Sequence, residues 1–248
     1  MISAMMQRPT DRRVELKGVG KTFGNVVAVE SIDLVVKTGE FVALLGPDGC
    51  GKTTILRIIA GLDAPTAGKV MIDGLDVTAL PPARRDVAFA FQTPALYPHL
   101  SAEQNIAFPL RAQGIPQNAI ERRVEEVIDR LEMEPIRKLK PRYLSPADER
   151  RVALARTMVR DPKLFLLDDP FDLVPAADRP RARERLRTMH NELRATTILA
   201  TNDAEEAAAL ADRVIVVETG KLLRIDVPQR EREPAVAAGI NAANRSNY

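Results

Sequence analysis

The amino-acid sequence predicts an α/β fold in which a mostly parallel sheet core carries an N-terminal antiparallel β-subdomain and an inserted helical subdomain. The first observation behind this prediction is an apolar run at residues 41–45, which leads into a glycine loop and then a helical stretch at 52–60. The second is a series of further apolar runs separated by helical stretches, which is typical of a parallel sheet covered on both faces. We expect these runs to be buried strands at 87–91, 164–167, 197–200 and 214–217.

The N-terminal segment, residues 14–36, reads as short β-segments broken at Gly18, Gly20 and Gly24. Apolar residues alternate with polar ones at 32–36, as they do in a half-buried strand. This segment is the expected N-terminal β-subdomain.

The third observation is the stretch between residues 92 and 160, where strand signals stop. Apolar residues recur there at helical spacing, at Ile120, Val124, Val127, Ile128 and Leu131. We therefore expect a helical subdomain over about 93–160, inserted into one domain that spans 1–227. Residues 228–248 are rich in Ala, Asn, Arg and Glu, and we expect them to form a loosely ordered tail.

Composition limits the class of protein. The chain has 248 residues, of which 45% are hydrophobic, enough for one large domain. Lys and Arg (36) nearly balance Asp and Glu (34), so bulk charge does not favour nucleic acid, and we expect no nucleic-acid partner. The single cysteine, Cys50, excludes an intrachain disulfide and fits a reducing cytoplasm. No apolar run reaches the roughly 18 residues of a membrane-spanning helix and no signal peptide is recognisable. At a membrane, such a chain would have to dock onto other subunits.

The glycine loop matches the phosphate-binding pattern G-x-x-x-x-G-K-[ST], and it lies between a strand and a helix as that pattern requires. Glycines let backbone N–H groups surround phosphate oxygens, and the helix N-terminus adds its positive dipole end. Lys52 is expected to reach the β- and γ-phosphates, and the Thr53 hydroxyl to bind Mg²⁺. The alternative is a glycine-rich turn with an accidental lysine. The predicted loop residues are Gly46, Pro47, Asp48, Gly49, Cys50, Gly51, Lys52, Thr53 and Thr54.

A phosphate loop alone indicates a P-loop (RecA-like) NTPase, a class that includes GTPases and kinases, but the Asn-Lys-x-Asp motif that reads guanine is absent. Three further segments resemble motifs of the ATP-binding-cassette (ABC) ATPases, in the order of that family. Residues 91–100 resemble the glutamine loop, particularly that of sugar and glycerol-phosphate importers. Residues 151–156 resemble the helix after the family's signature, and residues 164–171 resemble its Walker B strand.

The resemblance implies a role for several residues. Phe23 would stack on adenine, although it could equally be a hydrophobic anchor beside a turn. Gln92 would contact Mg²⁺ or the attacking water, and Asp168 would hold Mg²⁺ through water. An aspartate at the end of an apolar strand is otherwise costly, which favours the metal role. Cys50 could be a reactive thiol, but a small spacer in the loop is the preferred interpretation.

Two hydrolysis positions depart from the family pattern. The family usually carries Glu, as the base that polarises water, where this chain has Asp169. The shorter side chain loses roughly an ångström of reach, which can cost about 10²-fold in rate. The family's switch histidine is replaced by Asn202, which can donate a hydrogen bond but cannot carry a proton. Pro175 stands where an aspartate usually contacts the partner subunit.

The signature departs most. The family reads Leu-Ser-Gly-Gly-Gln, whose Ser and backbone N–H groups bind the γ-phosphate held by the opposite subunit. This chain continues from Ser145 with Pro146, Ala147, Asp148 and Glu149. Pro146 has no N–H to donate. Ser145 followed by proline and by two acidic residues in the first turn instead predicts a self-capped helix.

The resemblance implies the ATP-binding subunit of an ABC transporter, with ATP and Mg²⁺ as cofactors. Its implied partners are permease subunits, a second ABC ATPase in a homo- or heterodimer, and indirectly a solute-binding protein. The subunit would lie in the cytoplasm on the inner face of the membrane, with slow or asymmetric hydrolysis. The alternative is a nucleotide-binding pseudo-ATPase that regulates or scaffolds. Residues 228–238 resemble the lead into the regulatory β-domain of sugar-importer ATPases, and we expect that domain to be absent.

Overall fold

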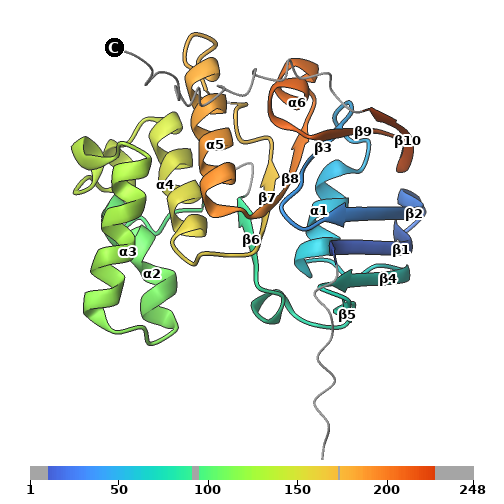
Figure 1. The fold of residues 1–248 in the computed structure, drawn as a ribbon, viewed down its shortest axis with the longest axis horizontal. Helices are drawn as coiled ribbons and strands as arrows, with labels where there is room; N and C mark the ends of the chain where they lie inside the picture. Colours follow the sequence, from blue (N-terminus) through green and yellow to red (C-terminus); the bar gives the residue numbers. More distant parts are fainter. Residues whose placement is uncertain (1–10, 91–94, 173, 227–248) are drawn as a thin grey trace, which may run out of the picture.

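The computed structural model describes residues 11–90, 95–172 and 174–226 (Figure 1). Its larger sheet has six strands in the order β10-β9-β3-β8-β7-β6. Five of them are joined by parallel pairings, and β10 runs antiparallel to β9. The strands are β3 (Phe41–Leu45), β6 (Val87–Ala90), β7 (Leu164–Asp168), β8 (Thr196–Thr201), β9 (Arg213–Glu218) and β10 (Lys221–Asp226). The strands expected from the apolar runs are confirmed, except that Phe91 lies outside the described residues.

A second sheet is antiparallel, with the order β2-β1-β4-β5. Its strands are β1 (Arg12–Phe23), β2 (Val26–Lys37), β4 (Ala67–Ile72) and β5 (Leu75–Asp76). The expectation of short segments broken at Gly18 and Gly20 is wrong, because both glycines lie inside the long strand β1. The register of β1 shifts on either side of them, so bulges absorb the glycines without ending the strand. Gly24, with φ 55°, does lie in the turn between β1 and β2.

Helices separate and cover the two sheets. In Figure 1, α1 (Lys52–Ala60) lies between the antiparallel sheet and the larger sheet. Between β6 and β7 the chain forms the expected helical insertion, seen at the left of Figure 1. Its helices are α2 (Ala102–Ala112), α3 (Gln117–Arg130) and α4 (Pro146–Met158), with 3-10 turns at Glu134–Ile136 and Pro141–Tyr143. A further 3-10 turn, Pro82–Arg84, precedes β6, and α5 (Arg179–Leu193) and α6 (Ala204–Leu210) flank β8. The predicted fold class is thus confirmed. Within the described ranges, no helix combines the length and apolarity needed to cross a bilayer.

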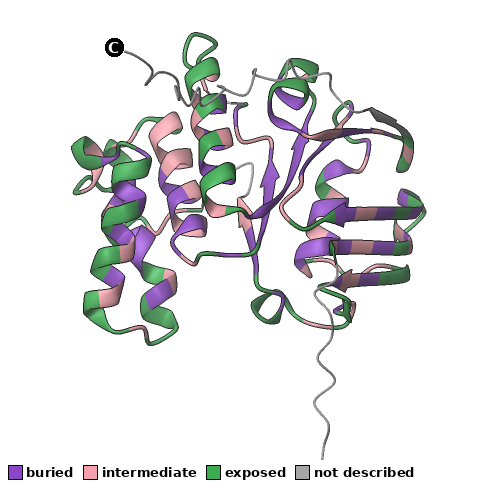
Figure 2. Cartoon of the chain, viewed as in Figure 1, coloured by how far each residue is buried: buried purple, intermediate pink, exposed green. Residues whose placement is uncertain are grey.

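Alternate residues of the core strands enter two separate hydrophobic cores, because successive side chains of a strand point to opposite faces. Phe41 and Ala43 face a core shared with the helical insertion, α5 and α6. Val42 and Leu44 face a core shared with α1 and the antiparallel sheet. Figure 2 shows the resulting continuous burial through the centre of the molecule. The sheet is therefore fixed from both sides, and the loops at the carboxyl ends of its strands have a rigid base.

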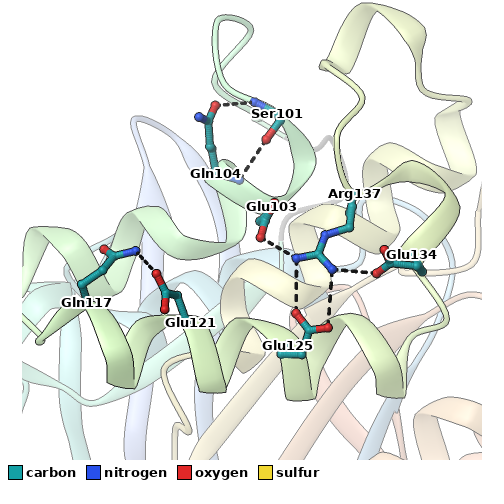
Figure 3. A network of polar contacts seen from close by, with 8 residues as sticks. All are labelled: Ser101, Glu103, Gln104, Gln117, Glu121, Glu125, Glu134 and Arg137. Atoms are coloured by element: carbon teal, nitrogen blue, oxygen red, sulfur yellow. Dashed lines mark hydrogen bonds and ion pairs between the residues drawn. The ribbon is translucent and has the colours of Figure 1, made fainter.

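One guanidinium links three segments of the helical insertion (Figure 3). Arg137 Nη2 donates to Glu103 of α2 at 2.7 Å and to Glu125 of α3 at 3.2 Å, and Nη1 donates to Glu134 at 2.8 Å. These hydrogen bonds raise the pKa of Arg137, the one to Glu103 most. The Arg137 side chain is 19% exposed, while its three carboxylate partners are between 37% and 66% exposed.

Candidate phosphate-binding site

The phosphate-binding pattern forms a loop between β3 and α1 whose backbone needs its glycines. Gly49 and Gly51 have φ values of 76° and 110°, a region that residues with side chains rarely adopt. A Cβ atom on Gly51 would lie 2.5 Å from the carbonyl oxygen of Ala28, and one on Gly46 would overlap that of Val217. The loop therefore packs directly against backbone of β2 and β9, with no room for side chains at these two positions.

Lys52 lies inside this loop. Its Nζ donates to the carbonyl oxygens of Gly46 at 2.8 Å and Pro47 at 2.9 Å, and the residue is 4% exposed. The charge of Lys52 also acts on the carboxyl groups of Asp168 and Asp169. Cys50 is 5% exposed, and its Sγ lies 4.0 Å from Lys52 Nζ.

Thr53 and Asp168 meet across the end of β7. Thr53 Oγ1 donates to Asp168 Oδ1 at 3.0 Å. Burial raises the pKa of Asp168, while the Thr53 hydrogen bond and the charge of Lys52 oppose that rise. Hydroxyl and carboxylate oxygens are the ligands that Mg²⁺ prefers. The pair thus has the right donor atoms beside a loop built for an anion.

Asp169 follows at the same strand end, and burial raises its pKa to about 6, with Lys52 opposing and Asp168, Asp48 and Asp172 adding to the rise. Its backbone has φ 44°, and its N–H donates to Ala200 at 3.0 Å. Three other carboxyl groups thus lie near that of Asp169, and the charge of Lys52 opposes their effect.

The switch position and the phosphate loop touch. Asn202 Nδ2 donates to Asp48 Oδ1 at 3.2 Å, between residues 154 positions apart in the chain. Both residues are exposed. Phe23 is 48% exposed, and Lys21 Nζ lies 4.7 Å from its ring centroid. Stacking on adenine by Phe23 stays a prediction.

Ser145 lies at the start of α4, where it caps the helix as expected. Its side chain accepts from the Asp148 N–H at 3.1 Å, and its hydroxyl donates to the Asp148 carboxylate at 2.7 Å. Pro146 is the first residue of the helix. Both functions of the Ser145 hydroxyl are thus engaged within its own helix. In the part of the chain that the structure describes, no hydrogen bond joins Ser145 to the phosphate loop.

The structure brings Lys52, Thr53, Asp168, Asp169 and Asn202 together around one loop. Gln92 and the tail 228–248 lie outside the described residues. Sequence reasoning missed the contact of Asp48 with Asn202 and the approach of Arg150 of α4 to Asp169. Both are long-range contacts between residues that no local pattern pairs, although an acidic residue within a phosphate-binding loop is itself an unusual choice.

Comparisons with known proteins show the family of this chain. The family model described as "ABC transporter" matches residues 29–172. The sn-glycerol-3-phosphate import ATP-binding protein UgpC 1 of Rhizobium johnstonii is 41% identical over 216 residues, covering 87% of this chain and 58% of that protein. The trehalose/maltose import ATP-binding protein MalK of Thermococcus litoralis is 43% identical over 221 residues, covering 87% of this chain and 59% of that protein. The predicted likeness to the ATPases of sugar and glycerol-phosphate importers is confirmed.

Among solved structures, the dimeric ATP-binding cassette MJ0796 in a post-hydrolysis state with ADP and Pi superposes with a TM-score of 0.80 at 30% identity, covering 88% of this chain and 99% of that one. This chain spans less than two thirds of the length of the two curated relatives. The matched residues, 29–172, include the loop between β3 and α1, the start of α4 and β7. The chain therefore belongs to the ABC transporter family.

Proposed function

We propose that this chain is the ATP-binding subunit of an ABC importer, in which Mg-ATP binding and slow hydrolysis drive solute import through separate permease subunits. The observation that carries the proposal is the cluster of Lys52, Thr53 and Asp168 around a loop that glycines alone can form. The names of the relatives, both import ATP-binding proteins, support the transporter class. Because those names give different solutes, the solute carried here is left open.

The residues present fit Mg-ATP. The backbone N–H groups of the loop and Lys52 would hold the phosphates, and Phe23 would stack on the adenine. Thr53, Asp168 and Gln92 would hold Mg²⁺, which would neutralise charge on the phosphates when bound. The remaining loop residues, from Gly46 through Thr54, would enclose the phosphates through their main chain.

We propose that hydrolysis is slow because Asp169 is shorter than the family's usual Glu and Asn202 cannot carry the charge of the usual His. Asp169 is the proposed base that orients the attacking water, and it lacks a methylene relative to the family's usual Glu. Asn202 is the proposed γ-phosphate contact, and in this structure it donates to Asp48. It must leave that acceptor before it can serve a phosphate.

The signature segment, which would face the nucleotide held by the opposite subunit, would also bind that nucleotide weakly. We propose that the chain pairs with a second ABC ATPase, itself or a relative, and that Ser145 faces the partner's nucleotide. The Ser145 hydroxyl is engaged with Asp148, and the two acidic residues of the first turn repel phosphate. Pro175 at the usual aspartate position removes one more contact to the partner.

The geometry of α4 also favours a second candidate, a pseudo-ATPase that binds nucleotide and regulates or scaffolds. A helix N-terminus closed by its own serine and aspartate contributes little to hydrolysis in trans. In both candidates residues 1–227 are the nucleotide-binding domain, with a helical subdomain at about 93–160. In the importer, this domain would lie on the inner face of the membrane, bound to permease subunits that receive solute from a solute-binding protein.

Affinity purification from native membranes separates the two candidates. The importer predicts that a permease pair, with or without a second ATPase, accompanies the chain, and that the complex turns over Mg-ATP. The double change Asp169→Glu and Asn202→His should then raise turnover modestly, since the start of α4 is unchanged. A soluble dimer with bound ATP, no permease and no turnover in either form would favour the pseudo-ATPase.

A further inference from the structure

A cation from α4 reaches the end of the Walker B strand. Arg150 Nη1 donates to the carbonyl oxygen of Asp169 at 3.0 Å, and Nη2 lies 3.7 Å from the carboxylate of Asp172. The Arg150 side chain is only 10% exposed. An arginine that is buried to this degree and divided between a main-chain oxygen and a carboxylate is held in one orientation.

The main chain that Arg150 contacts needs support. Asp169 adopts φ 44°, and the following residue is Pro170, which disfavours helical backbone in the residue before it. A residue with a side chain keeps such a backbone only where its neighbours hold it. The Asp169 N–H donates to Ala200 of β8 at 3.0 Å, and its carbonyl accepts from Asp172 at 3.4 Å and from Arg150. The direction of the Asp169 side chain depends on this backbone.

An open pocket lies between α4 and α5 at this point. A cavity of about 330 Å³ lies between the two helices and beneath the β7–α5 connection, and Arg150 is part of its wall. Leu154 of α4 and Leu186 of α5 line it from opposite sides, with Phe171 and Val174 from the connection. Beside this pocket, Arg150 joins α4 to the chain that follows β7.

We propose that Arg150 is a positioning residue through which α4, the helix capped by Ser145, sets the orientation of Asp169 in the same chain. Arg150 follows Ser145 by five residues, about 7.5 Å along a helix axis. A shift of α4 when its N-terminus meets a partner's nucleotide would therefore move the Asp169 peptide of its own site. The inference deepens the proposed function and rests on it for the role of Asp169 as base.

The test compares Arg150→Gln, Arg150→Lys and a matched control, Arg187→Gln, in the complex purified with its permease. Arg187 of α5 makes the same two kinds of contact, to the Leu210 carbonyl at 3.0 Å and to the Asp212 carboxylate at 2.8 Å, and its side chain is 24% exposed. Arg150→Gln should lower kcat about tenfold, while KM and the Kd for a non-hydrolysable ATP analogue change by less than about twofold, because positioning is lost and binding is kept. Arg150→Lys, which keeps the charge and one donor to the carbonyl, should recover part of kcat. Arg187→Gln should lower the melting temperature as much as Arg150→Gln but keep kcat within about twofold.

Three outcomes would overturn the inference: kcat within twofold of the parent in Arg150→Gln, no recovery in Arg150→Lys, or an equal loss of kcat in the Arg187 control. Hydrogen exchange provides a readout that is independent of turnover. Peptides covering residues 168–172 should exchange faster in Arg150→Gln than in Arg187→Gln, and equal exchange would contradict the inference. A parent that binds ATP without turnover would refute hydrolysis in the proposed function, and the exchange comparison would then decide the role of Arg150 by itself.

Discussion

Asp48 puts a negative charge into a loop whose glycines and lysine otherwise favour anions. Its carboxylate accepts from Asn202 and contributes to the raised pKa of Asp169. This hydrogen bond engages the side-chain amide of Asn202, the residue at the proposed switch position. At the scale of single residues, the site therefore combines groups that attract phosphate with a group that repels it.

Replacing Asp48 by serine should tighten Mg-ATP binding. Two unit charges about 4 Å apart in water interact by roughly 1 kcal/mol, so removal of this one should lower Kd about fivefold at low salt, and less at high salt. Titration with a fluorescent ATP analogue at two salt concentrations measures the effect. Asp129→Ser, an exposed change on α3, is the control and should leave Kd unchanged. Equal or weaker binding by Asp48→Ser would show that the carboxylate supports the loop.

At the scale of elements, the C-terminal end of α1 is closed by a buried arginine. Arg85 is 4% exposed and donates to the carbonyl oxygens of Ile58 and Ile59 in α1, and to those of Thr78 and Leu80. Burial lowers the pKa of Arg85. The positive charge of Arg85 thus lies at the C-terminal end of the helix that carries Lys52 and Thr53, where the last carbonyl groups of the helix stabilise it.

Arg85→Ala should lower the free energy of unfolding by about 3 kcal/mol, since it leaves several buried carbonyls without a donor. Urea denaturation followed by circular dichroism measures it. The neighbouring Arg84 is exposed, and Arg84→Ala should change stability by less than about 0.5 kcal/mol. Similar losses in both variants would mean that the Arg85 hydrogen bonds do not hold α1.

At the start of α4, we expect one set of substitutions to lower helix stability and to strengthen ATP-dependent dimerisation. The triple change Pro146→Gly, Ala147→Gly and Asp148→Gln restores the family pattern. It should lower helix stability by about 1 kcal/mol for each added glycine. It should also strengthen ATP-dependent dimerisation, because one hydrogen bond to a charged group contributes roughly 1.5–3 kcal/mol.

Analytical ultracentrifugation with Mg-ATP, in a background where hydrolysis is blocked, measures the dimer, and thermal melting measures the helix. The single change Asp148→Gln separates the effect of charge from that of the restored N–H donor. If the triple variant dimerises no better than the parent, the altered signature does not limit the dimer, and Pro175 becomes the next position to test.

At the scale of the whole molecule, the sequence predicted what local patterns carry. The strand, loop and helix around Lys52 and the capped start at Ser145 are visible in consecutive residues, and they lie where expected. The short strands β4 and β5 were missed, because Ala67–Ile72 begins with residues of weak strand preference and is completed by pairing with β1. The contacts of Asp48 with Asn202 and of Arg150 with Asp169 join distant segments, so only the folded chain shows them.

A buried carboxyl group should make the stability of the whole chain depend on pH. Burial raises the pKa of Glu206, which is 4% exposed, while a hydrogen bond from Thr201 opposes the rise. A raised folded-state pKa means that the protonated form is favoured by folding. The contribution of Glu206 to stability is therefore complete below about pH 4.5, its unfolded value, and is lost as pH rises through the folded-state pKa.

Glu206→Gln removes this titration and keeps an acceptor for Thr201. The variant should melt at a higher temperature than the parent at pH 7.5, and the difference should shrink toward pH 4.5. Calorimetry across that range measures it, with the exposed neighbour Glu205→Gln as a control that shows no such trend. A difference that stays constant with pH would assign the effect to packing.

We infer that the loop from Gly46 to Thr54 holds Mg-ATP. Equilibrium titration of the chain and of Lys52→Ala with a fluorescent ATP analogue tests this inference. Lys52 is held in the loop by two neutral carbonyls, so its removal deletes the charge opposite the β- and γ-phosphates. We expect saturable, magnesium-dependent binding by the parent and the loss of most affinity, at least about tenfold, in Lys52→Ala. Unchanged affinity in that variant, or no binding by a folded parent, would contradict it.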